Sequence, residues 1–424
     1  MSSPIRSFIE RQPLADTHEH LRSGPDCLAE GADLLEVLFG QYPGEDLVSA
    51  GATPEEMQAL LDASRDPADR WRTVERYWPH CEWTGYGESV RWVLRKLYEI
   101  EDLTPKTVSE ASVKHRAACK PGRREHLLRE TAGLSEVQID NILGEAWDRP
   151  PGEDTSFFRY DLSWFRMADG RFGKPEIERL EKSTAVPIHT FDDLDAAVSA
   201  LFEKEAPSRV AIKSQHAYQR SLAWREVPRG DAARIFNQVL RGEQPATEDA
   251  HALGDWFIGR AAEEGARHGL PFKIHCGYFA GNGSIELPWI SAGNLVPLLK
   301  KYTETKFILM HAAYPYCEEW IALGKHFRNV YLDFCWAWAI NPRTTQSVFR
   351  SALRAVPINK ILGFGGDALW PEMSAAYAAQ ARHGLAAALE AEIAAGDLPE
   401  SRAFEIARRV MGENQADLMP RRHP

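Results

Sequence analysis

The alternation of hydrophobic and polar stretches along the chain predicts a series of short buried strands. Short apolar segments rich in β-branched and aromatic residues recur, and stretches with helical periodicity separate most of them. Such segments are typical of buried parallel strands. The predicted strands are residues 13–18, 134–142, 157–164, 210–213, 272–275, 307–311, 330–334 and 361–364. Eight units of this kind predict an α/β fold, a (β/α)8 TIM barrel.

A long helical segment interrupts this pattern after the first strand. Residues 21–130 are rich in Glu, Arg, Trp and Leu, and Thr53-Pro54-Glu55-Glu56 predicts a helix start with threonine at the cap. The sequence therefore predicts a large helical insertion after strand one. The proposed divisions are 1–20 (N-terminal segment and strand one), 21–130 (helical insertion or lid), 131–372 (the rest of the barrel) and 373–424 (a C-terminal helical segment).

Polar residues that can bind metals stand at the ends of the predicted strands, where a barrel carries its active site. They are His18, His20, Lys213, His275, His311 and Asp367. Residues i and i+2 of a strand face the same side, so both histidines of the His-x-His pair can point into the barrel mouth. Imidazole and carboxylate together suit zinc and similar divalent ions. One such pair is weak evidence, but the whole set in rim order predicts a metal site.

This set resembles the signature of the amidohydrolase superfamily, a group of metal-dependent (β/α)8 barrels. The resemblance covers residues 13–372, and residues 210–220 and 412–416 resemble the amidohydrolase-related branch, which contains metal-dependent hydrolases, decarboxylases and relatives of uronate isomerase. The large insertion after strand one also resembles uronate isomerase. The resemblance implies that His18, His20, His275 and Asp367 are metal ligands, and that His311 is a ligand or a catalytic acid.

Lys213 bears on the number of metal ions. In binuclear members of the superfamily a strand-four lysine is carboxylated and bridges two ions, and Lys213 ends the predicted fourth strand. A second interpretation keeps Lys213 as an ammonium group that binds a substrate carboxylate. A third makes it a lysine of the surface or rim. The expected cofactor is one or two divalent ions, zinc first, with manganese or iron as alternatives.

Further residues beside the predicted strand ends are candidates for substrate binding. They are Tyr218, Arg220, Tyr314 and Trp370. The arginine side chain suits a carboxylate and the tyrosine a hydrogen bond to substrate, although a solvated arginine and ordinary aromatic packing are alternatives. The insertion adds a basic and aromatic group that we expect to cover the pocket and touch the substrate, unless its tryptophans only pack against the barrel. That group is Arg72, Arg76, Trp78, His80, Trp83 and Arg91.

The first functional prediction is a metal-dependent hydrolase that attacks a C–N or C–O bond of a small, carboxylate-bearing substrate. Asp367 would act as general base and then acid, and His311 would stabilise developing negative charge or assist the leaving group. One alternative is a mononuclear metal-dependent decarboxylase or an enzyme like uronate isomerase. Another is a non-catalytic barrel scaffold, which predicts that the metal ligands are lost.

Composition narrows the partners and the location. The 424 residues include 50 Lys and Arg against 61 Asp and Glu, a net charge of −11, which argues against nucleic acid as a partner. No apolar run approaches the ~20 residues of a membrane helix, and the first residues lack an apolar secretory core. Six cysteines without a Cys-x-x-Cys pair suit reduced thiols. We expect a cytoplasmic enzyme with a small-molecule substrate and no membrane partner; a homo-oligomer is compatible with the sequence.

Overall fold

Eight parallel strands form one sheet in the computed structural model of the chain, which describes residues 3–22, 33–142, 147 and 152–419. The strands are β1 (Leu14–Glu19), β2 (Leu134–Ile139), β3 (Phe158–Ser163), β4 (Arg209–Ser214), β5 (Phe272–Ile274), β6 (Phe307–Leu309), β7 (Val330–Asp333) and β8 (Ile361–Leu362). They neighbour one another in chain order. Backbone hydrogen bonds from Thr17 to Phe364 (3.0 Å) and from Asp367 to His18 (2.9 Å) join β1 to the segment after β8. The predicted (β/α)8 barrel is confirmed.

Strand β2 carries polar residues that are unusual for a buried strand. Glu136 accepts hydrogen bonds from Arg159 (3.0 Å) and Gln415 (2.5 Å), and Gln138 accepts one from Lys273 (2.6 Å). A buried polar side chain is tolerated when it is hydrogen-bonded. The polar side chains of β2 are therefore compatible with its place in the barrel.

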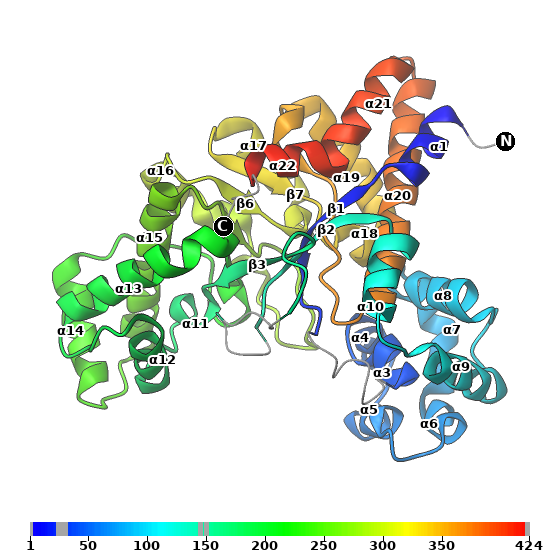
Figure 1. Cartoon of the computed structure of the whole chain (residues 1–424), viewed down its shortest axis with the longest axis horizontal. Helices are drawn as coiled ribbons and strands as arrows, with labels where there is room; N and C mark the ends of the chain where they lie inside the picture. The colour runs from blue at the N-terminus through cyan, green and yellow to red at the C-terminus, as the bar shows by residue number, and fades with distance from the viewer. Residues whose placement is uncertain (1–2, 23–32, 143–146, 148–151, 420–424) are drawn as a thin grey trace.

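Helices follow the strands and cover the outside of the barrel (Figure 1). They are α11 (Phe165–Ala168), α12 (Lys174–Thr184), α13 (Phe191–Glu205), α14 (Arg229–Leu240), α15 (Thr247–His268), α16 (Val296–Lys301), α17 (Cys317–His326), α18 (Ala337–Ile340), α19 (Pro342–Ala355) and α20 (Pro371–Ala394). Helix α15 lies between β4 and β5. It ends at Gly269, whose φ of 64° lies in the left-handed region that favours glycine. This sharp end lets β5 begin only three residues later.

The insertion between β1 and β2 is a helical unit whose buried residues join one hydrophobic core with the barrel. Its helices are α3 (Leu34–Phe39), α4 (Tyr42–Ser49), α5 (Pro54–Leu61), α6 (Pro67–Val74), α7 (Trp78–Cys81), α8 (Gly85–Tyr98), α9 (Pro105–Ala118) and α10 (Arg123–His126). Thr53 and Glu56 form a capping box at the start of α5. The Trp71 ring lies 5.6 Å from that of Phe39 and 6.1 Å from that of Trp78, measured between centroids. The side chains of this unit pack mainly on one another.

The ends of the chain cover the barrel face opposite the insertion. There lie α1 (Pro4–Arg11), α21 (Glu400–Arg408) and α22 (Asn414–Leu418), at the top of Figure 1. Asn414 donates hydrogen bonds to the carbonyl oxygens of Ile358 (2.7 Å) and Ile361 (2.8 Å), beside the start of β8. Helix α20 follows β8 and runs from Pro371 to Ala394, so the eighth barrel helix extends well into the predicted segment 373–424.

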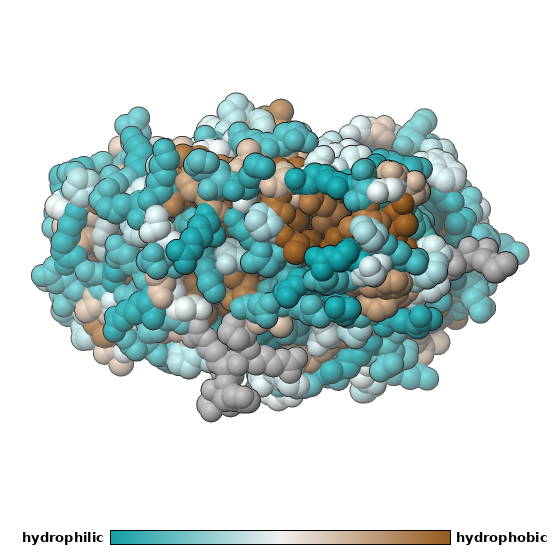
Figure 2. Space-filling view, turned by 90° about the horizontal axis from the view of Figure 1, so that it is seen from above, coloured by the Kyte–Doolittle hydropathy of each residue, from teal (hydrophilic) through white to brown (hydrophobic). Residues whose placement is uncertain are grey.

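The face of the molecule shown in Figure 2 is mostly polar. Seen from above the view of Figure 1, hydrophilic residues dominate, and a hydrophobic patch shows among them near the centre (Figure 2). In the described part of the chain, the exposed large hydrophobic residues are Trp83, Val113, Leu287 and Trp289. The described helices include none with the length and apolar character needed to cross a membrane.

Candidate metal centre

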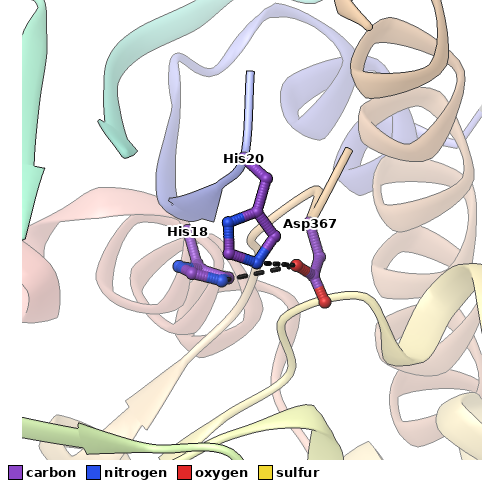
Figure 3. Close-up of side chains that lie close together, drawn as sticks. All are labelled: His18, His20 and Asp367. Atoms are coloured by element: carbon purple, nitrogen blue, oxygen red, sulfur yellow. Dashed lines mark ion pairs between the residues drawn. The ribbon is translucent and has the colours of Figure 1, made fainter. Parts of the chain in front are cut away.

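Two strand ends that are far apart in sequence bring three metal-binding side chains together. His18 and His20 leave β1 on the same side, and Asp367 follows β8. The Nε2 atoms of both histidines lie 3.3 Å from the same carboxylate oxygen, Oδ1 of Asp367 (Figure 3). All three residues are buried, and their ligand atoms lie within 4.8 Å of one another. This arrangement offers two imidazoles and one carboxylate to a single ion.

The hydrogen-bond pattern of this cluster fits a cation. Both ring nitrogens of His18 and both carboxylate oxygens of Asp367 are buried and make no hydrogen bond. Buried polar atoms without a partner are costly in a protein interior. A divalent ion held by His18, His20 and Asp367 would satisfy several of these atoms at once.

Burial keeps the histidines of the centre neutral. Desolvation lowers the pKa of His20 to about 3 and those of His18, His275 and His311 well below the ordinary value, and the charge of Lys213 lowers all four further. Metal ligation requires a neutral imidazole with a free lone pair. The four histidines are therefore in the form that binds metal at neutral pH.

Backbone carbonyls determine which ring nitrogen each of three histidines leaves free. Nδ1 of His20 lies 2.9 Å from the Asp140 carbonyl, and Nδ1 of His311 lies 3.1 Å from the Cys335 carbonyl. Nε2 of His275 lies 3.1 Å from the carbonyl of Tyr278, three residues later. A carbonyl oxygen only accepts hydrogen bonds, so in each case the nitrogen that faces it carries the hydrogen. His20 and His311 therefore present Nε2 to the centre, whereas His275 presents Nδ1.

His275 and His311 form a second pair next to the first. Their ring centroids lie 4.2 Å apart, and Nε2 of His311 lies 3.9 Å from Oδ2 of Asp367. The two oxygens of Asp367 thus face different groups, Oδ1 the histidine pair on β1 and Oδ2 the ring of His311 after β6. Burial raises the pKa of this carboxyl group to about 7, and the Lys213 charge opposes the rise.

Lys213 lies in the interior, with only 1% of its surface exposed. Its Nζ donates a hydrogen bond to Oε1 of Gln215 at 2.8 Å. Its charge lowers the pKa values of all four histidines and of Asp367. The interpretation as a surface lysine is wrong, because this side chain near the end of β4 is buried. The carboxylated and the ammonium forms both stay open.

The structure does not bring Arg220 to the centre. Its guanidinium group donates to Asp255 Oδ1 on α15 (2.8 Å) and to the Ala168 carbonyl (2.8 Å), and the pair with Asp255 is almost fully buried. The short helical turn His216–Tyr218 turns the chain after β4, and Arg220 then packs against the outer helices. In this structure the guanidinium thus serves a buried ion pair instead of a substrate carboxylate.

The predicted aromatic residues lie at different distances from the centre. The Tyr218 ring is 4.8 Å from that of His275, so this tyrosine borders the second histidine pair. The Tyr314 ring packs 6.5 Å from that of Tyr278. Trp370 is buried beneath the guanidinium group of Arg22, at 4.7 Å. Only Tyr218 among these three has a ring contact with a histidine of the centre.

The insertion reaches the centre through residues that the sequence did not single out. Gln41 Nε2 (3.1 Å) and the Tyr42 hydroxyl (2.8 Å) both donate to the main-chain carbonyl of Asp367. The Tyr42 ring also packs 4.2 Å from that of Trp336, which lies 5.6 Å from the His311 ring. These contacts place the insertion at the C-terminal face of the barrel. No motif marks Gln41 or Tyr42, because both lie in an ordinary helix start.

The side chains that we expected to touch the substrate from the insertion lie elsewhere. Arg72 and Arg76 are more than half exposed and pair with acidic residues of the insertion itself. Trp78 packs in the core of the insertion, and Trp83 is 69% exposed beneath Arg91. Trp78 is buried within the insertion and Trp83 is exposed, so contact between this group and a substrate stays a prediction.

Removal of the Tyr42 hydroxyl should weaken catalysis modestly. Asp367 has a φ of 59°, so hydrogen bonds to its carbonyl help to hold an unfavourable backbone conformation. Tyr42→Phe should lower kcat/KM roughly fivefold, the equivalent of about 1 kcal/mol for one hydrogen bond. Steady-state kinetics at saturating metal would measure it. Tyr77→Phe, which removes a hydroxyl bonded to Glu56 within the insertion, is the matched control and should change nothing.

A buried aspartate below the centre should make stability depend on pH. Burial raises the pKa of Asp333 to about 7, against the hydrogen bond that Oδ1 accepts from the Cys335 backbone at 2.9 Å. Its folded-state pKa exceeds its unfolded value, so the folded state loses stability as pH rises from about 4 to about 7. In metal-free protein, Asp333→Asn should therefore gain up to roughly 4 kcal/mol over wild type at pH 8 and almost nothing at pH 4.

Urea unfolding of the Asp333→Asn variant and of wild type at pH 4, 6 and 8 would measure this gain. The exposed Asp397→Asn is the control and should follow wild type at each pH. A gain for Asp333→Asn that stays constant across the three pH values would contradict the prediction.

Solved structures show that this architecture occurs in other proteins. Uronate isomerase from Thermotoga maritima matches with a TM-score of 0.78 at 14% identity, over 98% of this chain and 96% of that one. Glucuronate isomerase from Caulobacter crescentus matches with 0.78 at 15% identity, over 99% and 94%. A Lactobacillus casei protein assigned as a metal-dependent hydrolase matches with 0.65 at 17% identity, over 99% and 98%. At these identities the likeness shows the shared fold.

Sequence comparison gives a family. Protein fluG of Emericella nidulans is 26% identical over 224 residues, which are 50% of this chain and 26% of fluG, so the chain spans about a quarter of that relative. The family model described as Amidohydrolase matches residues 150–414, more than half of the chain. This match includes Lys213, His275, His311 and Asp367, and the His-x-His pair of β1 lies before it. The chain belongs to the Amidohydrolase family.

Proposed function

We propose that the protein is a hydrolase that uses a divalent metal ion to cleave a C–N or C–O bond of a small substrate. The observation that carries this proposal is the placement of the Asp367 carboxylate. Oδ1 faces His18 and His20, Oδ2 faces His311, and neither oxygen makes a hydrogen bond. One carboxylate can therefore help to hold an ion and also exchange a proton with a reacting group.

The chain offers ligands for one ion and the elements of a second site. His18, His20 and Asp367 would hold the first ion, and His275 and His311 would contribute to the second, with Lys213 as a bridge if it is carboxylated. When bound, a divalent metal lowers the pKa of water to ~7 and polarises a substrate carbonyl group. Zinc is the preferred ion for this nitrogen-rich set, and manganese or iron would also accept it.

Asp367 and His311 have different roles in the proposed proton transfers. Asp367 accepts a proton from the attacking water through Oδ2 and returns it to the leaving group. Oδ2 is available for this exchange, because Oδ1 is the oxygen that faces His18 and His20. His311 already uses Nδ1–H for the Cys335 carbonyl, and its neutral ring leaves a lone pair on Nε2. This geometry supports His311 as a ligand or proton acceptor and disfavours it as an acid.

The sequence analysis named Arg220 as the candidate that binds a substrate carboxylate, and the structure favours other residues for this role. Arg220 is engaged with Asp255, so it does not meet a substrate carboxylate at the centre. Tyr218 beside His275 stays a candidate for a polar contact to substrate. A carboxylate on the substrate would instead meet the Lys213 ammonium group, if that lysine is unmodified.

The second candidate is a mononuclear decarboxylase or an enzyme like uronate isomerase. The hydrogen bond from Lys213 to Gln215 favours it, because an ammonium group held in this way can bind a substrate carboxylate while one ion occupies the first site. We do not favour a non-catalytic scaffold, because such a protein should have lost ligands that here lie together. A cytoplasmic location and a homo-oligomeric state stay predictions.

Isotope-labelled water separates the two candidates. The protein is stripped with a chelator, reloaded with zinc, manganese or iron, and offered amides and esters of small acids, uronates, and carboxylic acids prone to decarboxylation. A hydrolase places ¹⁸O from water in its carboxylate product, whereas a decarboxylase releases CO2 and an isomerase keeps the substrate formula. Metal-dependent turnover of the last two substrate classes alone would overturn the hydrolase proposal.

A further inference from the structure

His18 differs from the other three histidines of the centre in the way that its ring is held. His20, His275 and His311 each direct one ring nitrogen to a backbone carbonyl. Nδ1 of His18 faces a side chain instead, the carboxylate of Asp161 on β3, with 3.8 Å between Nδ1 and Oδ2. This distance is that of an ion-pair contact and is longer than a hydrogen bond. The ring of His18 is thus oriented by a side chain, whereas the other three rings are oriented by the backbone. A substitution can therefore alter the orientation of His18.

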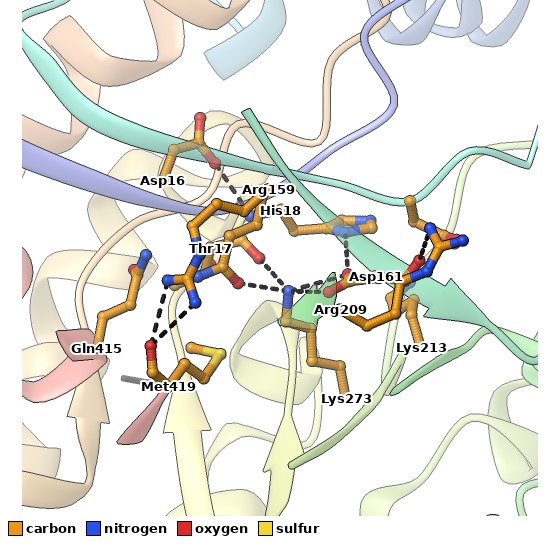
Figure 4. A network of polar contacts seen from close by, with 12 residues as sticks. Asp16, Thr17, His18, Arg159, Asp161, Arg209, Lys213, Lys273, Gln415 and Met419 are labelled. Atoms are coloured by element: carbon orange, nitrogen blue, oxygen red, sulfur yellow. Dashed lines mark hydrogen bonds and ion pairs between the residues drawn. The ribbon is translucent and has the colours of Figure 1, made fainter. Parts of the chain in front are cut away.

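Asp161 is in turn fixed by a buried lysine. Lys273 on β5 donates to both carboxylate oxygens of Asp161 at 2.9 Å, and neither side chain is exposed (Figure 4). The same Nζ atom donates to the carbonyl oxygen of Thr17 at 2.7 Å and to Gln138 at 2.6 Å. Thr17 directly precedes His18, so Lys273 holds His18 from two sides: its backbone through Thr17 and its ring through Asp161.

We propose that Asp161 and Lys273 are positioning residues that hold His18 with Nδ1 toward β3 and Nε2 toward the metal. A carboxylate that faces Nδ1 favours the ring form with hydrogen on Nδ1, and this form leaves the Nε2 lone pair free. Nε2 is the atom that lies 3.3 Å from Asp367. Lys273 keeps the carboxylate in place, because a lone buried charge would otherwise have no partner. The proposal rests on the metal centre of the proposed function and concerns how that centre is pre-organised.

Zinc affinity tests this proposal without any substrate. The zinc dissociation constant of the purified chain is measured by competition with a chromophoric chelator, for wild type and for Asp161→Asn. Loss of an outer carboxylate that orients a metal-binding histidine weakens metal affinity by roughly 10–100-fold. We expect a loss in that range for Asp161→Asn. A folded Asp161→Asn variant with wild-type zinc affinity would overturn the proposal.

A matched control separates positioning from general damage. Asp255→Asn breaks a similarly buried pair, that with Arg220, outside the centre. It should lose thermal stability but keep wild-type zinc affinity. An equal loss of affinity in Asp255→Asn would show a general effect and overturn the proposal. If Asp161→Asn fails to fold, the double variant Asp161→Asn with Lys273→Met, which removes both charges, is measured in its place, with the same two outcomes.

A measurement on the unmutated chain gives an independent test. In zinc-loaded protein labelled with ¹⁵N-histidine, the proposal expects hydrogen on Nδ1 of His18 and metal on Nε2. Metal on Nδ1 would overturn it. If wild type binds no zinc at all, the proposed metal centre itself fails, and this outcome is distinct from a wild type that binds zinc and an Asp161→Asn variant that binds it equally well.

Discussion

Asp367→Asn should lower kcat by roughly 10³-fold or more, because it removes both the carboxylate that helps to hold the ion and the group that exchanges the proton. Asparagine is chosen over alanine because residue 367 has a φ of 59°, a conformation that asparagine tolerates better. The fold should persist, because the amide is neutral and of similar size. Turnover, metal content and thermal unfolding of the same preparation would measure the loss of kcat, the loss of metal binding and the retention of the fold.

Asp169→Asn is the control for this change. Asp169 is a buried aspartate that bonds Arg171 in the turn after α11, away from the centre, and its amide variant should keep near wild-type turnover. An Asp367→Asn variant that retains turnover within tenfold of wild type would contradict the assignment of Asp367 to the chemistry.

Lys213→Ala should abolish activity and lower the metal content from two ions to one, if the binuclear hydrolase proposal holds. An ammonium group close to two cations is strongly disfavoured, whereas a carbamate supplies two anionic oxygens. Wild type should then show the added mass of one CO2 on Lys213 and depend on bicarbonate during reconstitution. A short carboxylate such as acetate should partly restore Lys213→Ala, because it can occupy the space of the lost side chain.

Lys213→Arg is the matched variant for this test. Guanidinium keeps its charge and cannot form a carbamate, so this variant should be inactive with or without acetate. Acetate should leave wild type unchanged. One ion per chain together with an unmodified Lys213 would contradict the binuclear proposal, and the mononuclear decarboxylase or isomerase would then be preferred.

The barrel and its metal-binding rim could be predicted because both follow from local patterns. Short apolar segments mark the strands, and a polar residue directly after each segment marks the rim. His18 and His20 stand at the end of β1, His275 and His311 within two residues of the ends of β5 and β6, and Asp367 in the short turn after β8. The structure brings them together because the ends of parallel strands meet at one face of a barrel.

The contacts that could not be predicted depend on partners far along the chain. Arg220 follows β4 as a substrate-binding residue might be expected to do, yet Asp255 on α15 holds it away from the centre. Gln41 and Tyr42 belong to no motif, and their role follows from the path of the insertion over β8. In the sequence, Asp161 is a single polar residue within a strand. Its proposed role depends on the contact with Lys273, more than a hundred positions later.

The split of the first ligand set between β1 and β8 determines when the ion can be bound during synthesis. His18 and His20 leave the ribosome before Asp367, which follows only after seven further strands have been made. The two histidines alone form an incomplete site, so the nascent chain cannot retain the ion there. Metal acquisition is therefore a late step that follows closure of the ring. Under the proposed function, a cell short of the divalent metal would accumulate closed barrels without it, and a brief addition of the ion would activate them without new protein synthesis.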